Sequence, residues 1–103
     1  MPYKIKILNT ALKNIDDIAD YTLEEWGEEQ MRIYIKSIFS LLDNLKNNPL
    51  EKGTDRSHLS PNLRSIMIRT HYHIFYRVNK RTVEVIRILH TKSNWSKVIK
   101  KST

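Results

Sequence analysis

The amino-acid sequence predicts an α+β domain in which a helical hairpin packs on one face of a small, mainly antiparallel sheet. Two observations support this prediction. Residues 9–45 carry two consecutive apolar stripes at three- to four-residue spacing, the period of an amphipathic helix. Residues 63–89 carry three strand-like runs separated by breaks short enough for hairpins. With a strand at the N-terminus, the expected order is β-α-α-β-β-β, in one domain over residues 1–103.

The first strand is expected over Tyr3 to Leu8, where apolar residues alternate with lysines. Asn9 or Thr10 then offers a side-chain oxygen to cap the first helix. Gly27 is expected to end that helix, because glycine tolerates the left-handed conformation found just past helix ends. The predicted apolar stripe of this helix consists of Leu12, Ile15, Ile18 or Ala19, Leu23 and Trp26.

The second helix is expected to follow Gly27 after a break of one or two residues, and Pro49 prevents it from continuing. Its predicted stripe consists of Met31, Tyr34, Ile35, Ile38, Leu41, Leu42 and Leu45. A break this short should fold the two helices into an antiparallel hairpin. A polar connector follows over residues 50–62.

Three strands are then predicted over Leu63–Arg69, Tyr72–Val78 and Thr82–Leu89. The last of these is the most continuously apolar run and should be central. The tail from Ser93 can form a short helix that places Trp95, Val98 and Ile99 on one side.

Composition excludes several classes of protein. The chain has no cysteine, so it can form neither a disulfide framework nor a thiolate metal site. Its four histidines are too scattered for a metal site, and we expect no cofactor. No apolar run is long enough to span a membrane, and the N-terminus lacks the apolar core of a signal peptide. We therefore expect a cytoplasmic protein.

Charge is distributed unevenly along the chain. Residues 1–63 carry a net charge of −2, whereas residues 64–103 carry +9 with Glu84 as their single acid. This asymmetry predicts an acidic or polyanionic partner for the C-terminal half. A solvated basic face is the simpler alternative.

Four segments, in order, resemble the RelE/ParE toxin superfamily, and its ParE branch most closely. They are IDDIADYTLEEWGEEQMRIYIKSIFSLLDNLKNNPLEKG, LSPNLRS, YHIFYRV and VEVIRILH, with a tryptophan shortly after the last. The resemblance covers roughly Tyr3 to Trp95. It implies the same β-α-α-β-β-β topology and the toxin of a bacterial type II toxin–antitoxin system. It also implies a hetero-oligomer with a ParD-like antitoxin.

Two targets are compatible with the resemblance. ParE-type toxins poison DNA gyrase and block replication, whereas RelE-type toxins cleave messenger RNA on the ribosome.

A ribonuclease needs a general base, a general acid and cations close to the phosphate. The candidates here are Arg64, Arg77, Arg87 and His90. No tyrosine follows Tyr76, and beyond His90 there is no second imidazole or carboxylate. We therefore favour gyrase inhibition without catalysis over an mRNA interferase. An inactive homologue that only binds antitoxin is a third hypothesis.

The acidic C-terminal segment of an antitoxin would suit the basic half of the chain. The residues predicted to contact partners are Arg64, Arg69, Arg77, Arg87, His90, Lys92 and Trp95. Direct nucleic-acid binding is another class, but no interleaved aromatic platform for a single strand is visible in the sequence.

Purely structural roles are also open for several of these residues. Strand alternation would place Arg87 on the face of Val83, Val85 and Leu89, where it could extend its charge to a sheet edge. His90 could simply bond a loop carbonyl. His71 and His73 are expected on the surface, whereas Trp26 and Trp95 are expected in the core or as a lid.

Overall fold

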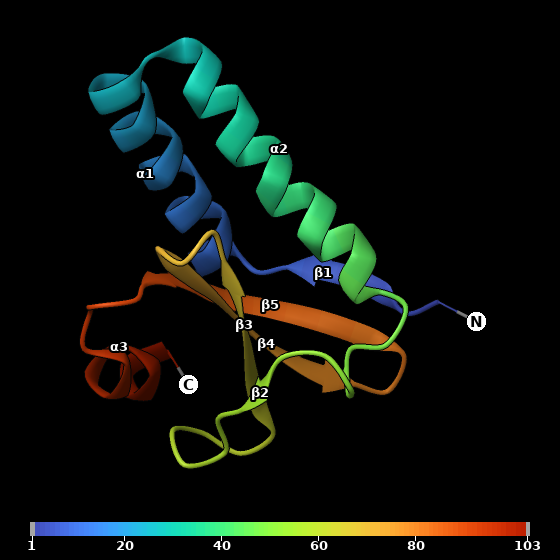
Figure 1. Ribbon diagram of the computed structural model, residues 1–103. Coiled ribbons are helices and arrows are strands. Elements are labelled where there is room, and N and C mark those ends of the chain that lie inside the picture. The colour runs from blue at the N-terminus through green and yellow to red at the C-terminus, as the bar shows by residue number, and fades with distance from the viewer. Residues whose placement is uncertain (1, 103) are drawn as a thin grey trace.

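The computed structural model describes residues 2–102 and contains five strands and three helices within that range. In chain order they are β1 (Lys4–Ile7), α1 (Asn9–Trp26), α2 (Glu28–Leu45), β2 (Thr54–Asp55), β3 (Leu63–Ile68), β4 (Tyr72–Asn79), β5 (Thr82–His90) and α3 (Trp95–Ser102). The strands form one sheet in the order β1-β5-β4-β3-β2. The predicted α+β class and the order of the main elements are confirmed (Figure 1).

The sheet is mainly antiparallel, as predicted. β3, β4 and β5 form a meander, and β1 joins β5 in parallel, so β5 lies inside the sheet. The predicted connector contains one additional element, the two-residue strand β2. It pairs with β3 only through Thr54 and Asp55, opposite Ser65 and Arg64. The outer edge of β3 beyond Ser65 therefore has no neighbouring strand in the described part of the chain.

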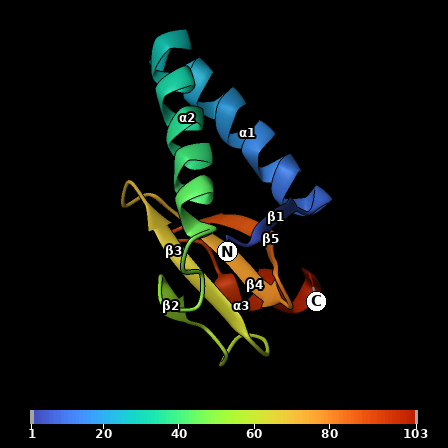
Figure 2. The same ribbon diagram turned by 90° about the vertical axis from the view of Figure 1, so that its right-hand side faces the viewer.

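The helices divide between the two faces of the sheet. α1 and α2 rise together from one face, with their connection at Gly27 far from the sheet, and α3 lies against the other face (Figures 1 and 2). Two buried clusters correspond to these layers. The hairpin-side cluster includes Ile15, Ile38 and Ile74, and the α3-side cluster includes Phe75 and Ile99.

The predicted apolar stripe of α1 is partly wrong. The buried residues of α1 are Ala11, Ile15, Ile18 and Thr22, which lie on a face rotated from the predicted one. Leu12, Leu23 and Trp26 are exposed, and the Trp26 side chain is 69% exposed. The small side chains of Ala11 and Thr22 let the helix approach its neighbours closely, whereas periodicity favours the larger apolar residues.

Both ends of α1 differ in detail from the expectation. Asn9 and Thr10 do not cap the helix; the capping position is Leu8, which has no side-chain bond to the helix. The Thr10 hydroxyl instead donates to the Ile86 carbonyl of β5 at 2.7 Å. Gly27 interrupts the helices as predicted, with φ at 91°, and α2 resumes at Glu28, which agrees with the expected short break. Glu28 and Glu29 suit this first turn because carboxylates stabilise helix N-termini.

An irregularity in β5 changes the orientation of its side chains. The register with β4 shifts between Phe75 and Tyr76, so Phe75 faces Arg87 while Tyr76 faces Val85. A bulge of this kind inserts one extra residue and interrupts strict alternation. Val85 therefore packs in the hairpin-side cluster, whereas Arg87 lies opposite Phe75 of the α3-side cluster. The expectation that Arg87 shares a face with Val83 and Val85 is wrong.

Candidate functional site

Arg64 holds the connector against the sheet on its hairpin side. It lies opposite Tyr76, a member of the hairpin-side cluster. Its Nη2 and Nε donate to the Lys52 carbonyl at 3.0 and 3.2 Å, and Nη2 also donates to the Gly53 carbonyl at 3.3 Å. A guanidinium has five donors in a fixed plane, and these contacts use the Nε–Nη2 edge. The geometry gives Arg64 a structural task in joining β3 to the preceding loop.

Arg77 performs a similar task on the opposite face of the sheet. It pairs with Leu63, the neighbour of Arg64, and successive strand residues point to opposite faces. Its Nε donates to the Pro61 carbonyl at 3.0 Å and its Nη2 to the Ser60 hydroxyl at 2.7 Å. Arg64 and Arg77 are therefore not directed at one common substrate position.

Arg87 and His90 do not complete a cluster with them. Arg87 lies on the α3 side, whereas His90 is exposed at the end of β5, opposite Tyr72 and on the hairpin side. Along the β3–β4 register, Tyr72 stands at the end of the sheet remote from Arg64. The structure thus separates the four candidate catalytic residues between two faces and two ends of the sheet.

Trp95 anchors α3 on the sheet, as a lid residue. Its ring lies 4.6 Å from His73 and 5.2 Å from Phe75 between centroids, and the Arg56 guanidinium lies 5.0 Å from its centroid. Its indole N–H donates to the His90 carbonyl at 3.0 Å. Contacts to four residues from three segments fix the start of the C-terminal helix.

His73 is buried beneath this lid, so the expectation of a surface histidine is wrong. Its Nδ1 lies 3.4 Å from the Ser65 hydroxyl, which accepts a bond from Arg56 Nε at 3.0 Å. Burial and the charge of Arg56 lower the pKa of His73 below 6.5. A neutral imidazole beside a serine hydroxyl is a feature of nucleophilic sites. Here, however, the Trp95 ring packs against the His73 imidazole.

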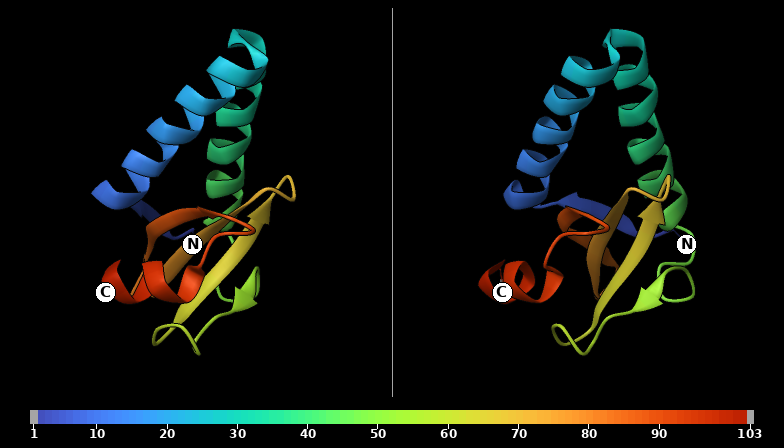
Figure 3. Two further views of the ribbon diagram at one scale, coloured as in Figure 1. Left: turned by 90° about the vertical axis from the view of Figure 1, so that its left-hand side faces the viewer. Right: turned by 60° about the vertical axis from the view of Figure 1, so that its left-hand side comes forward.

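A cleft of about 640 Å³ opens between the hairpin and the end of the sheet. We call it the aromatic cleft, and its lining consists of Tyr21, Thr22, Trp26, Gln30, Tyr34, Arg69, His71, Tyr72 and His90. The turn between β3 and β4 rises beside the hairpin on this side (Figure 3). Sequence analysis missed Tyr21, Tyr34 and Tyr72 as site residues, because they come from two helices and a strand that only the fold brings together.

Tyr34 and Tyr72 form the inner wall of the aromatic cleft. Their rings meet edge to face at 5.9 Å, and Tyr72 meets His90 in the same way at 5.3 Å. Burial raises the pKa of Tyr34 to about 12 and also raises the pKa of Tyr72, so both are neutral phenols near pH 7. The Tyr34 hydroxyl is buried without a hydrogen-bond partner among the described residues.

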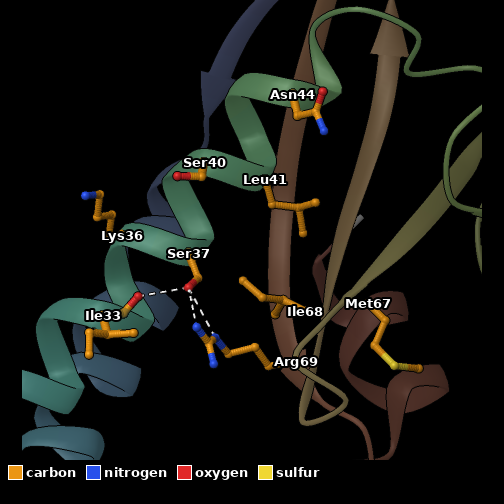
Figure 4. A pocket seen from close by; sticks show the side chains of 9 residues that line it. All are labelled: Ile33, Lys36, Ser37, Ser40, Leu41, Asn44, Met67, Ile68 and Arg69. Carbon is orange, nitrogen blue, oxygen red and sulfur yellow. Dashed lines mark hydrogen bonds between the residues drawn. The ribbon is translucent and has the colours of Figure 1, made fainter.

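A second recess lies between α2 and the free edge of β3, with a volume of about 610 Å³. We call it the α2–β3 groove, and Figure 4 shows its lining: Ile33, Lys36, Ser37, Ser40, Leu41, Asn44, Met67, Ile68 and Arg69. Lys36 and Arg69 are its charged residues, and no carboxylate lines it. The groove is therefore apolar in part and positively charged.

Arg69 lines both recesses. It sits in the tight β3–β4 turn with φ at 49°. Its Nε and Nη2 each lie 3.1 Å from the Ser37 hydroxyl, which donates to the Ile33 carbonyl (Figure 4). Of the residues predicted to contact partners, Arg69 and His90 are brought to this end of the molecule, and Lys92 follows His90 closely. Arg64, Arg77, Arg87 and Trp95 lie elsewhere.

Comparison with known proteins identifies relatives over most of the chain. The family model described as the ParE toxin of type II toxin–antitoxin system, parDE, matches residues 5–95. Toxin ParE1 of Caulobacter vibrioides is 31% identical over 93 residues, which cover 90% of this chain and 92% of that protein. Toxin ParE1 of Mycobacterium tuberculosis is 29% identical over 83 residues, covering 80% of this chain and 83% of that protein.

Solved structures with a similar fold include a chain of a ParDE system and the toxin RelE. A chromosomal ParDE toxin–antitoxin system from P. aeruginosa contains a chain with a TM-score of 0.77 and 19% identity, covering 87% of this chain and 97% of that one. A mutant of the E. coli toxin RelE with two arginine-to-alanine substitutions gives a TM-score of 0.68 and 18% identity, covering 95% of this chain and 93% of that one.

Within the described residues, no helix is long and apolar enough to cross a membrane, and no three His, Asp or Glu side chains gather as metal ligands.

Proposed function

Because the chain belongs to the ParE toxin family of type II toxin–antitoxin systems, we propose that it inhibits DNA gyrase and is neutralised by a ParD-like antitoxin. The match over residues 5–95 is the observation that carries this proposal. The toxin would act in the cytoplasm by stabilising the cleaved gyrase–DNA complex, without chemistry of its own.

Site geometry supports a non-catalytic mechanism. General acid–base catalysis requires groups within hydrogen-bond reach of one reacting centre. Arg64 and Arg77 are engaged by loop oxygens on opposite faces, and His90 stands at the other end of the sheet. An mRNA interferase would need a different arrangement of these side chains. The RelE-like fold alone does not favour that activity, because one fold hosts several functions.

The α2–β3 groove is the surface we propose for the antitoxin. Leu63 accepts from the Arg56 backbone N–H on the outer edge of β3, so alternation directs the polar groups of Met67 to the same edge. An extended acidic segment could add there as a strand and place its carboxylates near Lys36 and Arg69. Affinity for such a partner should fall with increasing salt, because exposed charge pairs are screened.

A gyrase supercoiling assay with the purified chain tests the target. We expect loss of supercoiling and accumulation of cleaved DNA, both reversed by the antitoxin. A translating extract provides the opposing test, because an mRNA interferase would cut messages at defined codons. Normal supercoiling without cleaved DNA at a high excess of toxin would refute gyrase inhibition. Codon-positioned cleavage abolished by His90→Ala would establish the alternative.

A further inference from the structure

We infer that the aromatic cleft binds a nucleotide unit, that is, a nucleobase together with its phosphate. The unit can come from a free mononucleotide or from one position of a single strand. This inference does not depend on gyrase as the target. It reverses the expectation from the sequence that the chain has no aromatic platform for nucleic acid, since the platform is assembled from separate segments.

Stacking surfaces are the first argument. The edge-to-face series Tyr34, Tyr72 and His90 fixes three rings along one wall, with centroid separations of 5.9 and 5.3 Å. Trp26 and Tyr21 on α1 also line the cleft and expose 69% and 55% of their surface. A nucleobase has two π-faces and stacks on aromatic side chains whatever its sequence. The cleft volume of about 640 Å³ also falls within the range of small-molecule sites.

Charge is the second argument, and it orients the ligand. Arg69 lines the sheet side of the cleft beside the rings of His71 and His90, and it is the charged residue of a lining to which no Asp or Glu contributes. Carboxylates lie close by on the hairpin tip, where Glu25 and Glu28 flank Trp26 and Gly27. A phosphate should therefore lie at the sheet end, near Arg69, with the base toward the hairpin.

Hydrogen-bonding groups provide the third argument. The backbone N–H of Lys92 donates to His90 Nδ1 at 3.1 Å, so Nδ1 is an acceptor and Nε2 is the ring nitrogen left to donate to a ligand. Gln30 and Thr22 contribute an amide and a hydroxyl to the lining, groups able to pair with the edge of a base. The buried Tyr34 hydroxyl has no partner among the described residues, and burying such a group unpaired is costly.

A peptide is the competing occupant, and the two recesses differ in what they offer it. The α2–β3 groove adjoins an unpaired strand edge, which suits an extended peptide. The aromatic cleft offers rings and a guanidinium instead. The observations therefore favour the nucleotide in the cleft.

Fluorescence anisotropy of the full chain with a labelled single strand of deoxyadenosine tests the inference. Adenosine monophosphate serves as competitor, and a separate titration with an acidic peptide covers the alternative. We expect binding that Trp26→Ala weakens by about tenfold, the scale of one stacked base. Arg69→Ala should also weaken binding, and reduce its salt dependence, because it removes the contact with the phosphate. Tyr21→Ser provides an independent variant of the same cleft. Competition by the mononucleotide would identify the free ligand as sufficient, whereas binding of the strand alone would identify the polymer.

Matched controls separate the cleft from general charge and apolar surface. Phe39→Ala removes an exposed aromatic side chain of α2 outside the cleft, and Lys97→Ala removes one exposed cation of α3. Both should leave the affinity within about twofold, since neither contacts the ligand. Absence of binding at low salt would overturn the inference. Equal affinities of the cleft variants and the control variants for the labelled strand would also overturn it. Binding of the acidic peptide in the cleft without binding of nucleotides would do the same.

Discussion

Replacing Trp95 with alanine should lower the free energy of unfolding by about 3 kcal/mol, from the sum of its contacts. The bond from its indole N–H to the His90 carbonyl contributes about 1 kcal/mol. The ring contacts with His73 and Phe75 contribute roughly 0.5–1.5 kcal/mol each. The Arg56 guanidinium adds about 0.5–1 kcal/mol. Because part of the indole is exposed, we expect the loss of unfolding free energy to lie in the lower half of the range that these contributions span together.

Urea denaturation of the variant checks this value, with Trp26→Ala as the matched control. Trp26 is 69% exposed, so its truncation should change the free energy of unfolding by no more than about 0.5 kcal/mol. Trp95→Phe should fall between the two, because phenylalanine keeps a ring but loses the donor. An unfolding free energy of Trp95→Ala close to that of the unmodified protein would refute the structural role of Trp95. It would leave partner contact as its remaining function.

Three further predictions concern the loop and the sheet. Tyr76→Phe should cost about 1–3 kcal/mol, because the single proton of its buried hydroxyl is shared between the carbonyls of Pro49 and Lys52, at 2.7 and 2.8 Å, and urea denaturation measures the loss. Gly53→Ala should lower the melting temperature in calorimetry, because a Cβ at φ 75° would lie 2.6 Å from the Ser65 carbonyl oxygen; an unchanged temperature would contradict this geometry. The lowered pKa of His73 means that the unfolded chain binds the proton more readily. Stability should therefore be complete above pH 6.5 and decline as the pH falls below it, a dependence that His73→Phe should flatten in denaturation at several pH values.

The sequence was sufficient to predict the order of the main elements, because their apolar periods differ. It could not identify which side of α1 is buried. Periodicity predicts that Leu12 and Leu23 are buried, but the close packing of the helix buries Ala11 and Thr22 instead. The bulge opposite Phe75 was equally invisible, because its residues are ordinary strand formers.

The recessed surfaces were less predictable than the fold. Arg69 and His90 were identified from charge and position, and both line the aromatic cleft. Tyr34 and Tyr72 were not, because one belongs to a predicted core stripe and the other begins a strand. Their rings become a wall only where the hairpin meets the sheet. Sites assembled from distant segments leave no local motif for sequence reasoning to find.

The shared position of Arg69 links the two proposed binding surfaces. Its guanidinium is held at the Ser37 hydroxyl and lies 5.9 Å from the centroid of Tyr34, so one side chain borders both the groove and the cleft. A carboxylate in the groove and a phosphate in the cleft would both require this charge. Because linkage between two sites is reciprocal, each ligand should weaken the other by the same factor. An antitoxin bound along α2 would then release a nucleotide without covering the aromatic rings that hold it.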